Sequence, residues 1–201
     1  MMKDRQFGDD IAAYQEMIDR SLERINGMRS LIMDLLDLTK IESGKPVQHL
    51  EPVNITKIAQ ISVDTMRPYA IQKDVDIYLN TKENVTMEAD PNEIEIIFNN
   101  LISNAVKYNK NGGRVDVFIE SKKEEVVLQV SDSGIGMTDE EKGRLFQDFV
   151  RIKNQKTRNI AGSWLGLSIL KKIIDMYKGE IEIKSIHDKG TSFIIKLPVN
   201  N

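Results

Sequence analysis

A seven-residue repeat of isoleucine constrains the N-terminal part of the chain more tightly than any other feature of the sequence. The repeat, and the residues between its members at heptad d spacing, are Ile11, Ile18, Ile25, Ile32 and Tyr14, Ser21, Met28, Leu35. This period predicts one long helix over residues 9–42, capped by Asp9 or Asp10. Isoleucine at four successive a positions is typical of a helix bundle or coiled coil, although a helix packed on its own domain remains the alternative. The pattern therefore predicts a homodimer through residues 11–39.

The heptad pattern stops at a break that divides the chain in two. Gly44 and Pro46 end the helix, which gives domains at residues 1–44 and 45–201. Beyond the break, patterns typical of strands occur at residues 53–55, 75–80, 86–89, 114–121, 125–132, 180–186 and 191–198. Helical patterns occur at residues 56–73, 90–108, 138–147 and 165–177. Antiparallel hairpins separated by helices predict an α+β fold, a two-layer α/β sandwich with helices on one face of a mixed sheet.

The composition excludes several classes of protein. The 201-residue chain is 40% hydrophobic and 29% charged, as in ordinary globular domains. Its net charge of −3 argues against a nucleic-acid-binding surface, and the absence of cysteine excludes disulfides and thiolate metal sites. No apolar run approaches the ~18 residues of a membrane span, and the N-terminus does not resemble a signal peptide. We therefore expect a cytoplasmic protein without membrane contact of its own, although a longer parent protein could carry an anchor.

The helix predicted at residues 90–108 carries a row of polar side chains beside its apolar stripe. Asp90 is a good N-cap, and Asn100, Asn104 and Lys107 follow at spacings of four and three residues. At 3.6 residues per turn these three side chains lie one above another, along the edge of the buried face. Amides in that position cost free energy unless they are hydrogen-bonded. Either the protein or a ligand must therefore satisfy them.

Two glycine-bearing turns are candidates for ligand contact. The first, at residues 131–137, follows a predicted strand and contains Asp132, Gly134 and Gly136. Glycine lets the backbone turn sharply and approach a ligand, and Asp132 is placed to accept a hydrogen bond from an amino group. An ordinary strand-to-helix turn would also explain this pattern.

The second glycine-bearing turn opens the last predicted helix, whose first N–H groups would suit an anion such as a phosphate. Between the two turns, residues 151–159 contain almost no apolar side chains. The basic residues of this segment are Arg151, Lys153, Lys156 and Arg158. A solvated loop would have this composition, and so would a mobile lid over a phosphate chain.

In this order, the segments resemble the ATP-binding domain of sensor histidine kinases, which belongs to a wider group shared with gyrase, Hsp90 and MutL. The segments that resemble the N, G1, F and G2 boxes and the Gly-Thr turn are residues 100–108, 132–137, 145–151, 162–169 and 190–191. Residues 33–45 resemble the second helix of the dimerisation and phosphotransfer domain. The resemblance covers about residues 10–199. It implies that residues 1–44 are part of that domain and residues 45–201 the ATP-binding catalytic domain.

The resemblance implies a role for each residue that matches a box. Asn100 would hold a Mg²⁺ that bridges the phosphates, and Asn100 and Lys107 would be the catalytic residues. Asp132 would accept from the adenine amino group, and Trp164 is anomalous. The residues implied in ATP binding are Asn100, Asn104, Lys107, Tyr108, Asp132, Gly134, Gly136, Arg151, Gly162, Gly166, Leu167 and Thr191. The residues implied in the lid are Phe146, Phe149, Lys153, Lys156 and Arg158.

The implied activity is transfer of the γ-phosphate of Mg²⁺–ATP to a histidine of the dimerisation domain, for relay to an aspartate of a response regulator. The phosphoacceptor is missing, because His49 and His187 are the only histidines and neither lies on a long helix. We therefore expect a fragment that does not autophosphorylate by itself. A neutral Asn100, where ATPases of the wider group have a glutamate that activates water, favours a kinase over a hydrolase. The alternatives are such an ATPase and a degenerate or engineered nucleotide-binding scaffold with impaired kinase activity.

Trp164 generates the first prediction, because it stands where the related box has its middle glycine. A turn that needs glycine to approach a phosphate would be strained or blocked by an indole. We expect the Trp164→Gly variant to bind ATP more tightly than the unaltered chain in a calorimetric titration. Equal affinities would contradict this, and no nucleotide binding by either protein would favour the scaffold alternative.

Overall fold

The computed structural model describes residues 11–42, 48–81, 83–145 and 165–199. Its helices are α1 (Ile11–Glu42), α2 (Ile55–Gln72), α3 (Pro91–Lys107), α4 (Asp139–Gly143) and α5 (Gly166–Met176). Its strands are β1 (Glu51–Asn54), β2 (Val75–Thr81), β3 (Thr86–Ala89), β4 (Gly113–Ser121), β5 (Glu125–Asp132), β6 (Glu180–Ile186) and β7 (Gly190–Pro198).

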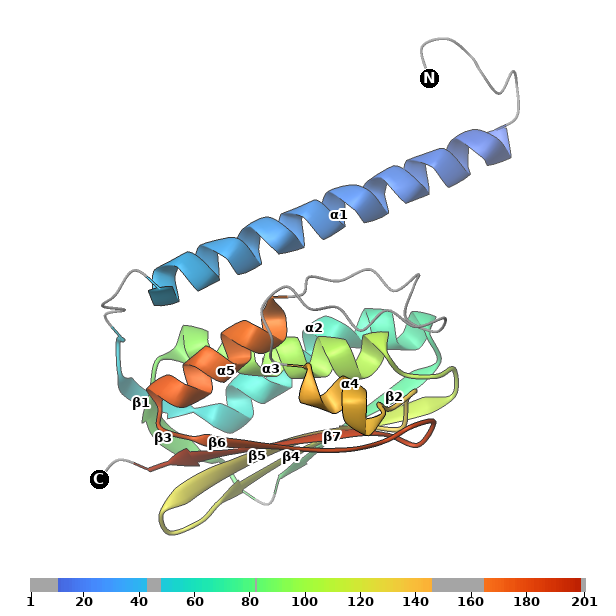
Figure 1. The fold of residues 1–201 in the computed structure, drawn as a ribbon. Helices are drawn as coiled ribbons and strands as arrows, with labels where there is room; N and C mark the ends of the chain where they lie inside the picture. Colours follow the sequence, from blue (N-terminus) through green and yellow to red (C-terminus); the bar gives the residue numbers. More distant parts are fainter. Residues whose placement is uncertain (1–10, 43–47, 82, 146–164, 200–201) are drawn as a thin grey trace.

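Five strands form a mixed sheet whose one face is covered by helices α2, α3 and α5 (Figure 1). The strand order is β2-β4-β5-β7-β6, in which β2 and β4 are parallel and the other pairs are antiparallel. Strands β1 and β3 form a separate antiparallel pair. The chain passes from β2 to β4 through β3 and α3, a connection of the length that parallel neighbours require. The predicted two-layer sandwich is therefore confirmed.

Helix α3 is the central element of the helical layer because its apolar stripe is buried completely. Its start is fixed by Asp90, whose carboxylate accepts from the backbone N–H of Asn92 at 2.9 Å, with Pro91 at the first helical position. The stripe, in which every residue is at most 1% exposed, consists of Ile94, Ile97, Phe98, Leu101 and Ile102. This burial fixes the rotation of α3 about its axis.

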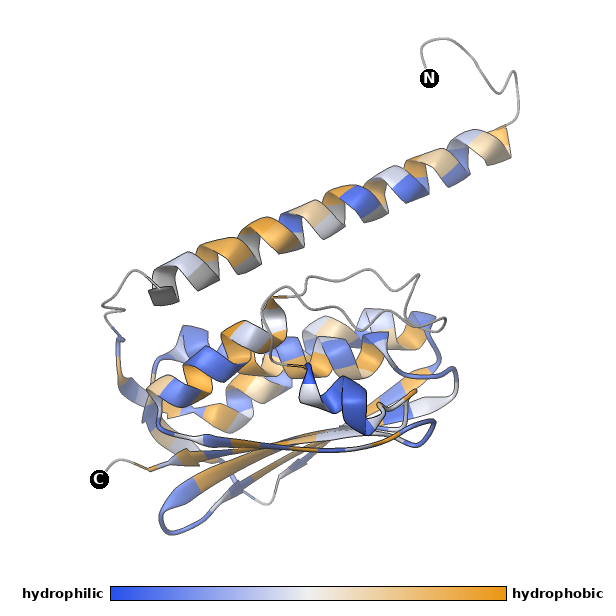
Figure 2. Ribbon diagram, in the orientation of Figure 1, coloured by the Kyte–Doolittle hydropathy of each residue, from blue (hydrophilic) through white to orange (hydrophobic). Residues whose placement is uncertain are grey.

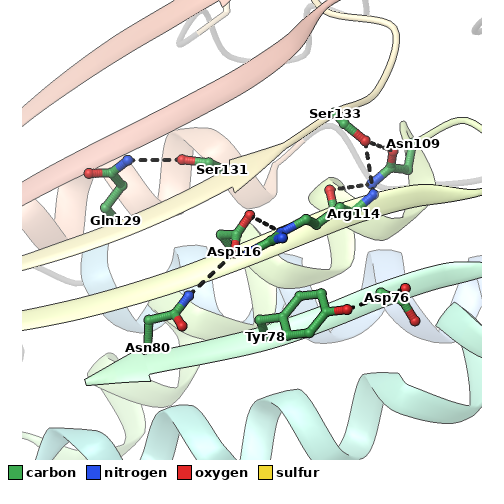
Figure 3. Close-up of polar contacts among 9 residues, drawn as sticks. All are labelled: Asp76, Tyr78, Asn80, Asn109, Arg114, Asp116, Gln129, Ser131 and Ser133. Carbon is green, nitrogen blue, oxygen red and sulfur yellow. Dashed lines mark hydrogen bonds and ion pairs between the residues drawn. The ribbon is translucent and has the colours of Figure 1, made fainter. Parts of the chain in front are cut away.

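The opposite face of the sheet is polar (Figure 3). On it, the Arg114 guanidinium bonds to the Asp116 carboxylate at 2.6 and 2.5 Å and lies 4.4 Å from the centre of the Tyr78 ring. Asn80 donates to the same carboxylate at 3.3 Å, and Gln129 bonds to a neighbouring serine on β5. Because ionic side chains occupy this face, the helices cover the other one, and one core lies between the two layers.

The short helix α4 begins with a capping box, which the spacing of Thr138 and Glu141 in the sequence predicts. The Thr138 hydroxyl accepts from the N–H of Glu141 at 3.3 Å, and the Glu141 carboxylate accepts from the N–H of Thr138 at 2.9 Å. The helix ends at Gly143, earlier than expected, because glycine has a low helix propensity. The expected end, Gln147, lies outside the described residues.

Helix α1 lies across the helical layer, on the side away from the sheet, and apolar residues recur along it (Figures 1 and 2). Its large apolar side chains that are 45–78% exposed are Ile11, Leu22, Ile25, Met28, Leu31, Ile32, Leu35 and Leu36. The predicted helix is thus present, with its apolar stripe mostly uncovered by the rest of the chain. The expected caps Asp9 and Asp10, and the break at Gly44 and Pro46, lie outside the described residues. Within the described ranges, no helix combines the length and apolar character needed to cross a membrane.

Candidate functional site

The polar row on α3 lies half-buried at the edge of the helical layer, as its spacing predicts. The side-chain nitrogen of Asn100 donates to the backbone carbonyl of Ile96 at 3.0 Å. Because a carbonyl can only accept, this bond assigns the nitrogen and leaves the amide oxygen on the other side of the carboxamide. That oxygen faces Gly166 at the start of α5, where any Cβ would overlap it. Asn104 and Lys107 follow on the same helix, and both are half-buried.

Helix α5 contributes its first turn to this site. Leu165 is its N-cap and is buried, so its apolar side chain makes no capping hydrogen bond to the first turn. Gly166 is buried and Leu167 half-buried. The N-terminal N–H groups and the positive end of the helix dipole therefore lie beside the Asn100 oxygen, an arrangement that suits an anion and its counter-cation.

The C-terminal end of α3 is held by Lys73, which follows α2. Its ammonium donates to the backbone carbonyl of Val106 at 3.1 Å and to that of Lys107. A cation at a helix C-terminus satisfies carbonyls that lack helical partners and interacts favourably with the dipole. Partial burial lowers the pKa of Lys73. Sequence reasoning missed this residue, since nothing in the sequence places it beside a helix end 33 residues away.

Asp132 lies at the end of β5, where its carboxylate is held by backbone N–H groups. One carboxylate oxygen accepts from Gly134 at 2.8 Å and from Thr191 at 3.3 Å. Burial raises the pKa of Asp132 to about 6, against the lowering effect of these two bonds. A buried carboxylate with an incomplete hydrogen-bond set is a candidate for ligand recognition.

The turn after Asp132 packs tightly against the residue that ends α3. The N–H of Ile135 donates to the carbonyl of Tyr108 at 3.1 Å, and a Cβ at Gly134 would overlap that carbonyl. Gly136 has φ +58°, and a Cβ there would overlap the carbonyl of Ile186. Glycine is therefore required at both positions. Tyr108 thus contacts the turn through its backbone carbonyl.

Two further side chains brace the turn, and sequence reasoning missed both. Asn109 is 5% exposed, and its amide donates to the carbonyl of Arg114 at 3.1 Å and accepts from the N–H of Lys110 at 3.0 Å. The Ser185 hydroxyl lies 2.9 Å from that of Thr191 and accepts from the N–H of Met137 at 2.8 Å. Asn109 also accepts from the Ser133 hydroxyl at 3.3 Å, so these bonds link the turn after Asp132 to β4, β6 and β7.

The structure thus brings together Asn100, Asn104, Lys107 and Gly166 on one side, and a second group around Asp132 on the other. The second group consists of Tyr108, Asp132, Gly134, Gly136 and Thr191. The other predicted site residues lie outside the described residues: Phe146, Phe149, Arg151, Lys153, Lys156, Arg158, Gly162 and Trp164. In the described ranges, no three His, Cys, Asp or Glu side chains gather as a metal site would need.

Both histidines are exposed and stand outside helices, as the sequence predicts. His49 precedes β1, and His187 lies in the turn between β6 and β7, next to Asp188.

Comparisons with known proteins agree with this geometry. Residues 89–201 match the family described as histidine kinase-, DNA gyrase B- and HSP90-like ATPases. The circadian input-output histidine kinase CikA of Synechococcus elongatus is 34% identical over 172 residues, which are 84% of this chain and 23% of CikA. This chain therefore spans less than a quarter of that relative's length.

Two solved structures have the same fold. Full-length ShkA in complex with AMPPNP is 22% identical with a TM-score of 0.77, over 94% of this chain and 39% of ShkA. The histidine kinase ThkA in complex with the response regulator protein TrrA is 21% identical with a TM-score of 0.74, over 99% of this chain and 55% of ThkA.

The raised pKa of Asp132 predicts a pH-dependent cost to stability. A carboxyl whose pKa rises from 3.8 in the unfolded chain to about 6 in the folded one stabilises the fold below pH 3.8, and that contribution is lost as the pH rises through 6. A shift of this size corresponds to about 3 kcal/mol. We expect Asp132→Asn to raise the free energy of unfolding at pH 7.5 by about 1–3 kcal/mol in urea melts, and by less at pH 4.5.

A matched control is Asp175→Asn, which changes an exposed carboxylate paired with Lys171. It should alter the free energy of unfolding by no more than about 0.5 kcal/mol at either pH. An Asp132→Asn variant that is equally destabilised at both pH values would contradict the prediction.

Proposed function

The chain belongs to the family of histidine kinase-, DNA gyrase B- and HSP90-like ATPases, and from this premise we propose that it is the catalytic core of a sensor histidine kinase that binds Mg²⁺–ATP. In this proposal it transfers the γ-phosphate to a histidine on a dimerisation helix that this sequence lacks. The single observation that carries the proposal is the orientation of the Asn100 amide oxygen toward the first turn of α5. In this proposal, an oxygen that can ligate a metal lies beside N–H groups that can bind an anion.

Asn100 and the residues that follow it on α3 fit a metal-bound triphosphate. The described residues hold no cluster of three metal-ligating side chains, so a Mg²⁺ at Asn100 would need the phosphate oxygens as further ligands. Mg²⁺ when bound neutralises charge on the phosphates. The Asn104 amide and the Lys107 ammonium follow Asn100 along α3, where they would contact the phosphates. The positioning of this row is supported by Lys73 at the end of the helix.

The group around Asp132 fits the adenine. An ionised Asp132 accepts from an amino group, and Gly134 lets the backbone lie close enough to contact the base. Because the pKa of Asp132 is about 6, the carboxylate is mostly ionised at pH 7 and can act as an acceptor. Phosphoryl transfer needs positioning and charge neutralisation more than covalent chemistry by the protein, and these two groups supply both.

Asn100 also bears on the choice between a kinase and a hydrolase. A carboxamide ligates a metal but cannot remove a proton from water, so it cannot serve as a general base. The proposal therefore excludes efficient ATP hydrolysis by this chain. Steady release of free phosphate from ATP would favour an ATPase instead.

The partners in this proposal are the missing histidine helix and a response regulator. The histidine would lie on a separate segment, because His49 and His187 are exposed outside helices. The ThkA structure contains a response regulator protein, which supports the same class of partner for this chain. The expected phosphate route is ATP to histidine to an aspartate of that partner.

The role proposed for Asn100 predicts a loss of metal dependence. Without the amide oxygen, Mg²⁺ loses its protein ligand, so Asn100→Ala should weaken binding of a non-hydrolysable ATP analogue by about tenfold or more in the presence of Mg²⁺. Titration calorimetry with Mg²⁺ and with EDTA should give nearly equal affinities for the variant and unequal ones for the unaltered chain. Asn99→Ala is the matched control, since the Asn99 amide bonds to Glu95 on its own helix. An Asn100→Ala variant that keeps its Mg²⁺ dependence would refute the proposed metal role.

The exposed stripe of α1 leads us to propose a homodimer through residues 11–39. Ile25 and Ile32 are 60% and 57% exposed, and burying both in a partner would remove apolar area from water. We expect the unaltered chain to sediment as a dimer and the Ile25→Glu, Ile32→Glu double variant as a monomer. Ile61→Glu on α2, where the isoleucine is 51% exposed, should leave the dimer intact. A monomer at high concentration of the unaltered chain would contradict the proposal.

A further inference from the structure

Helices α3 and α5 pack against one another and meet at two places. At one, Asn100 of α3 faces Gly166 at the start of α5. At the other, Asp90 at the start of α3 bonds to Tyr177 at the end of α5. The start of each helix therefore lies beside a later part of the other, so the two helices are antiparallel.

Tyr177 makes the second contact through a buried hydroxyl. The ring is 7% exposed, and its oxygen accepts from the backbone N–H of Asp90 at 2.8 Å. Burial raises the pKa of Tyr177, and the nearby Glu93 carboxylate raises it further. The bond to the Asp90 N–H fixes the position of the hydroxyl relative to the first turn of α3.

The spans between the two contacts match along both helices. From Asp90 to Asn100 is ten residues and from Gly166 to Tyr177 is eleven, which correspond to about 15 and 16.5 Å of helix. A bond that fixes the helices at one end therefore sets how far α5 reaches along α3 at the other. A slide of α5 would move the Gly166 amide away from the Asn100 oxygen.

We propose that Tyr177 is a positioning residue that sets the register of α5 against α3 and thereby places Gly166 opposite the Asn100 carboxamide. This inference deepens the proposed function and rests on it. The residue acts on the phosphate and metal side of the site alone, because the adenine side is built from Asp132, Gly134 and Thr191, which bond to one another. Loss of the hydroxyl should therefore weaken one half of the site and spare the other.

Residues 48 and 49 bond to the carboxylates of Asp90 and Glu93. Gln48 donates to the Glu93 carboxylate at 2.8 Å, and the backbone N–H of His49 donates to that of Asp90 at 3.1 Å. Neither bond involves Tyr177, so we expect both bonds to remain in the Tyr177→Phe variant. The substitution removes one oxygen from a ring that otherwise keeps its packing.

The test compares two probes on the unaltered chain and on Tyr177→Phe. The probes are a non-hydrolysable ATP analogue with Mg²⁺, which uses both halves of the site, and adenosine, which uses the adenine half alone. We expect the affinity for the Mg²⁺-bound analogue to fall about three- to tenfold, the size of one lost buried hydrogen bond, with adenosine affinity changed less than about twofold. The control Tyr78→Phe, at an exposed ring on the polar face of the sheet, should change neither.

A second variant covers the case in which Tyr177→Phe does not fold. Tyr177→His keeps an aromatic ring at this position but is too short to reach the N–H of Asp90, and it should give the same selective loss. Unchanged affinities, or equal losses for both probes, would overturn the positioning role. If the unaltered chain bound neither adenosine nor the analogue, the proposed function itself would fail, and the inference with it.

Discussion

The burial of one apolar stripe on α3 determines where the polar row of that helix lies. Ile97, Phe98 and Leu101 have no room to leave the core, so the helix cannot rotate about its axis. Asn100 and Lys107 are then held at the border between the helical layer and solvent, where a ligand can reach them. The same packing that stabilises the fold therefore also orients the amide oxygen of Asn100 toward α5. A site built on a rigid helix needs little further ordering when its ligand arrives.

Much of the fold follows from sequence patterns that act over short distances. The seven-residue repeat predicts α1, and the N-cap at Asp90 and the capping box at Thr138 predict the starts of α3 and α4. The alternation of apolar and polar residues predicts the strands and their hairpins, and these strands form the mixed sheet. Each of these signals lies within a few residues of the structure that it produces, so a single sequence is sufficient to read it.

The residues that hold the site in place are not revealed by such short-range patterns. Lys73, Asn109 and Tyr177 each bond to a group on a different element, and two of these bonds join residues 33 and 87 positions apart. Their side chains are common in loops and helix ends, so no local pattern distinguishes them from solvated residues. Only the folded topology brings Lys73 and Tyr177 to a helix terminus. The sequence patterns therefore point to the groups that we propose face a ligand, but they do not reveal the groups that hold those residues in place.

Asp132 shows why such bracing is needed. Its carboxylate loses hydration on burial, and the N–H groups of Gly134 and Thr191 compensate only in part, since its pKa remains raised. An isolated buried carboxylate would either take up a proton or pull its loop outward into water. The loop is held by two bonds: the Ser133 hydroxyl donates to the Asn109 amide at 3.3 Å, and the N–H of Met137 donates to the hydroxyl of Ser185 on β6 at 2.8 Å. Asn109 and Ser185 bond in turn to β4 and β7. The fold thus keeps an under-satisfied acceptor in place, and an amino group that donates to it would relieve part of the desolvation cost. In the proposed function, the free energy by which Asp132 destabilises the fold would be recovered in part on binding, as selectivity for a base that carries such a donor.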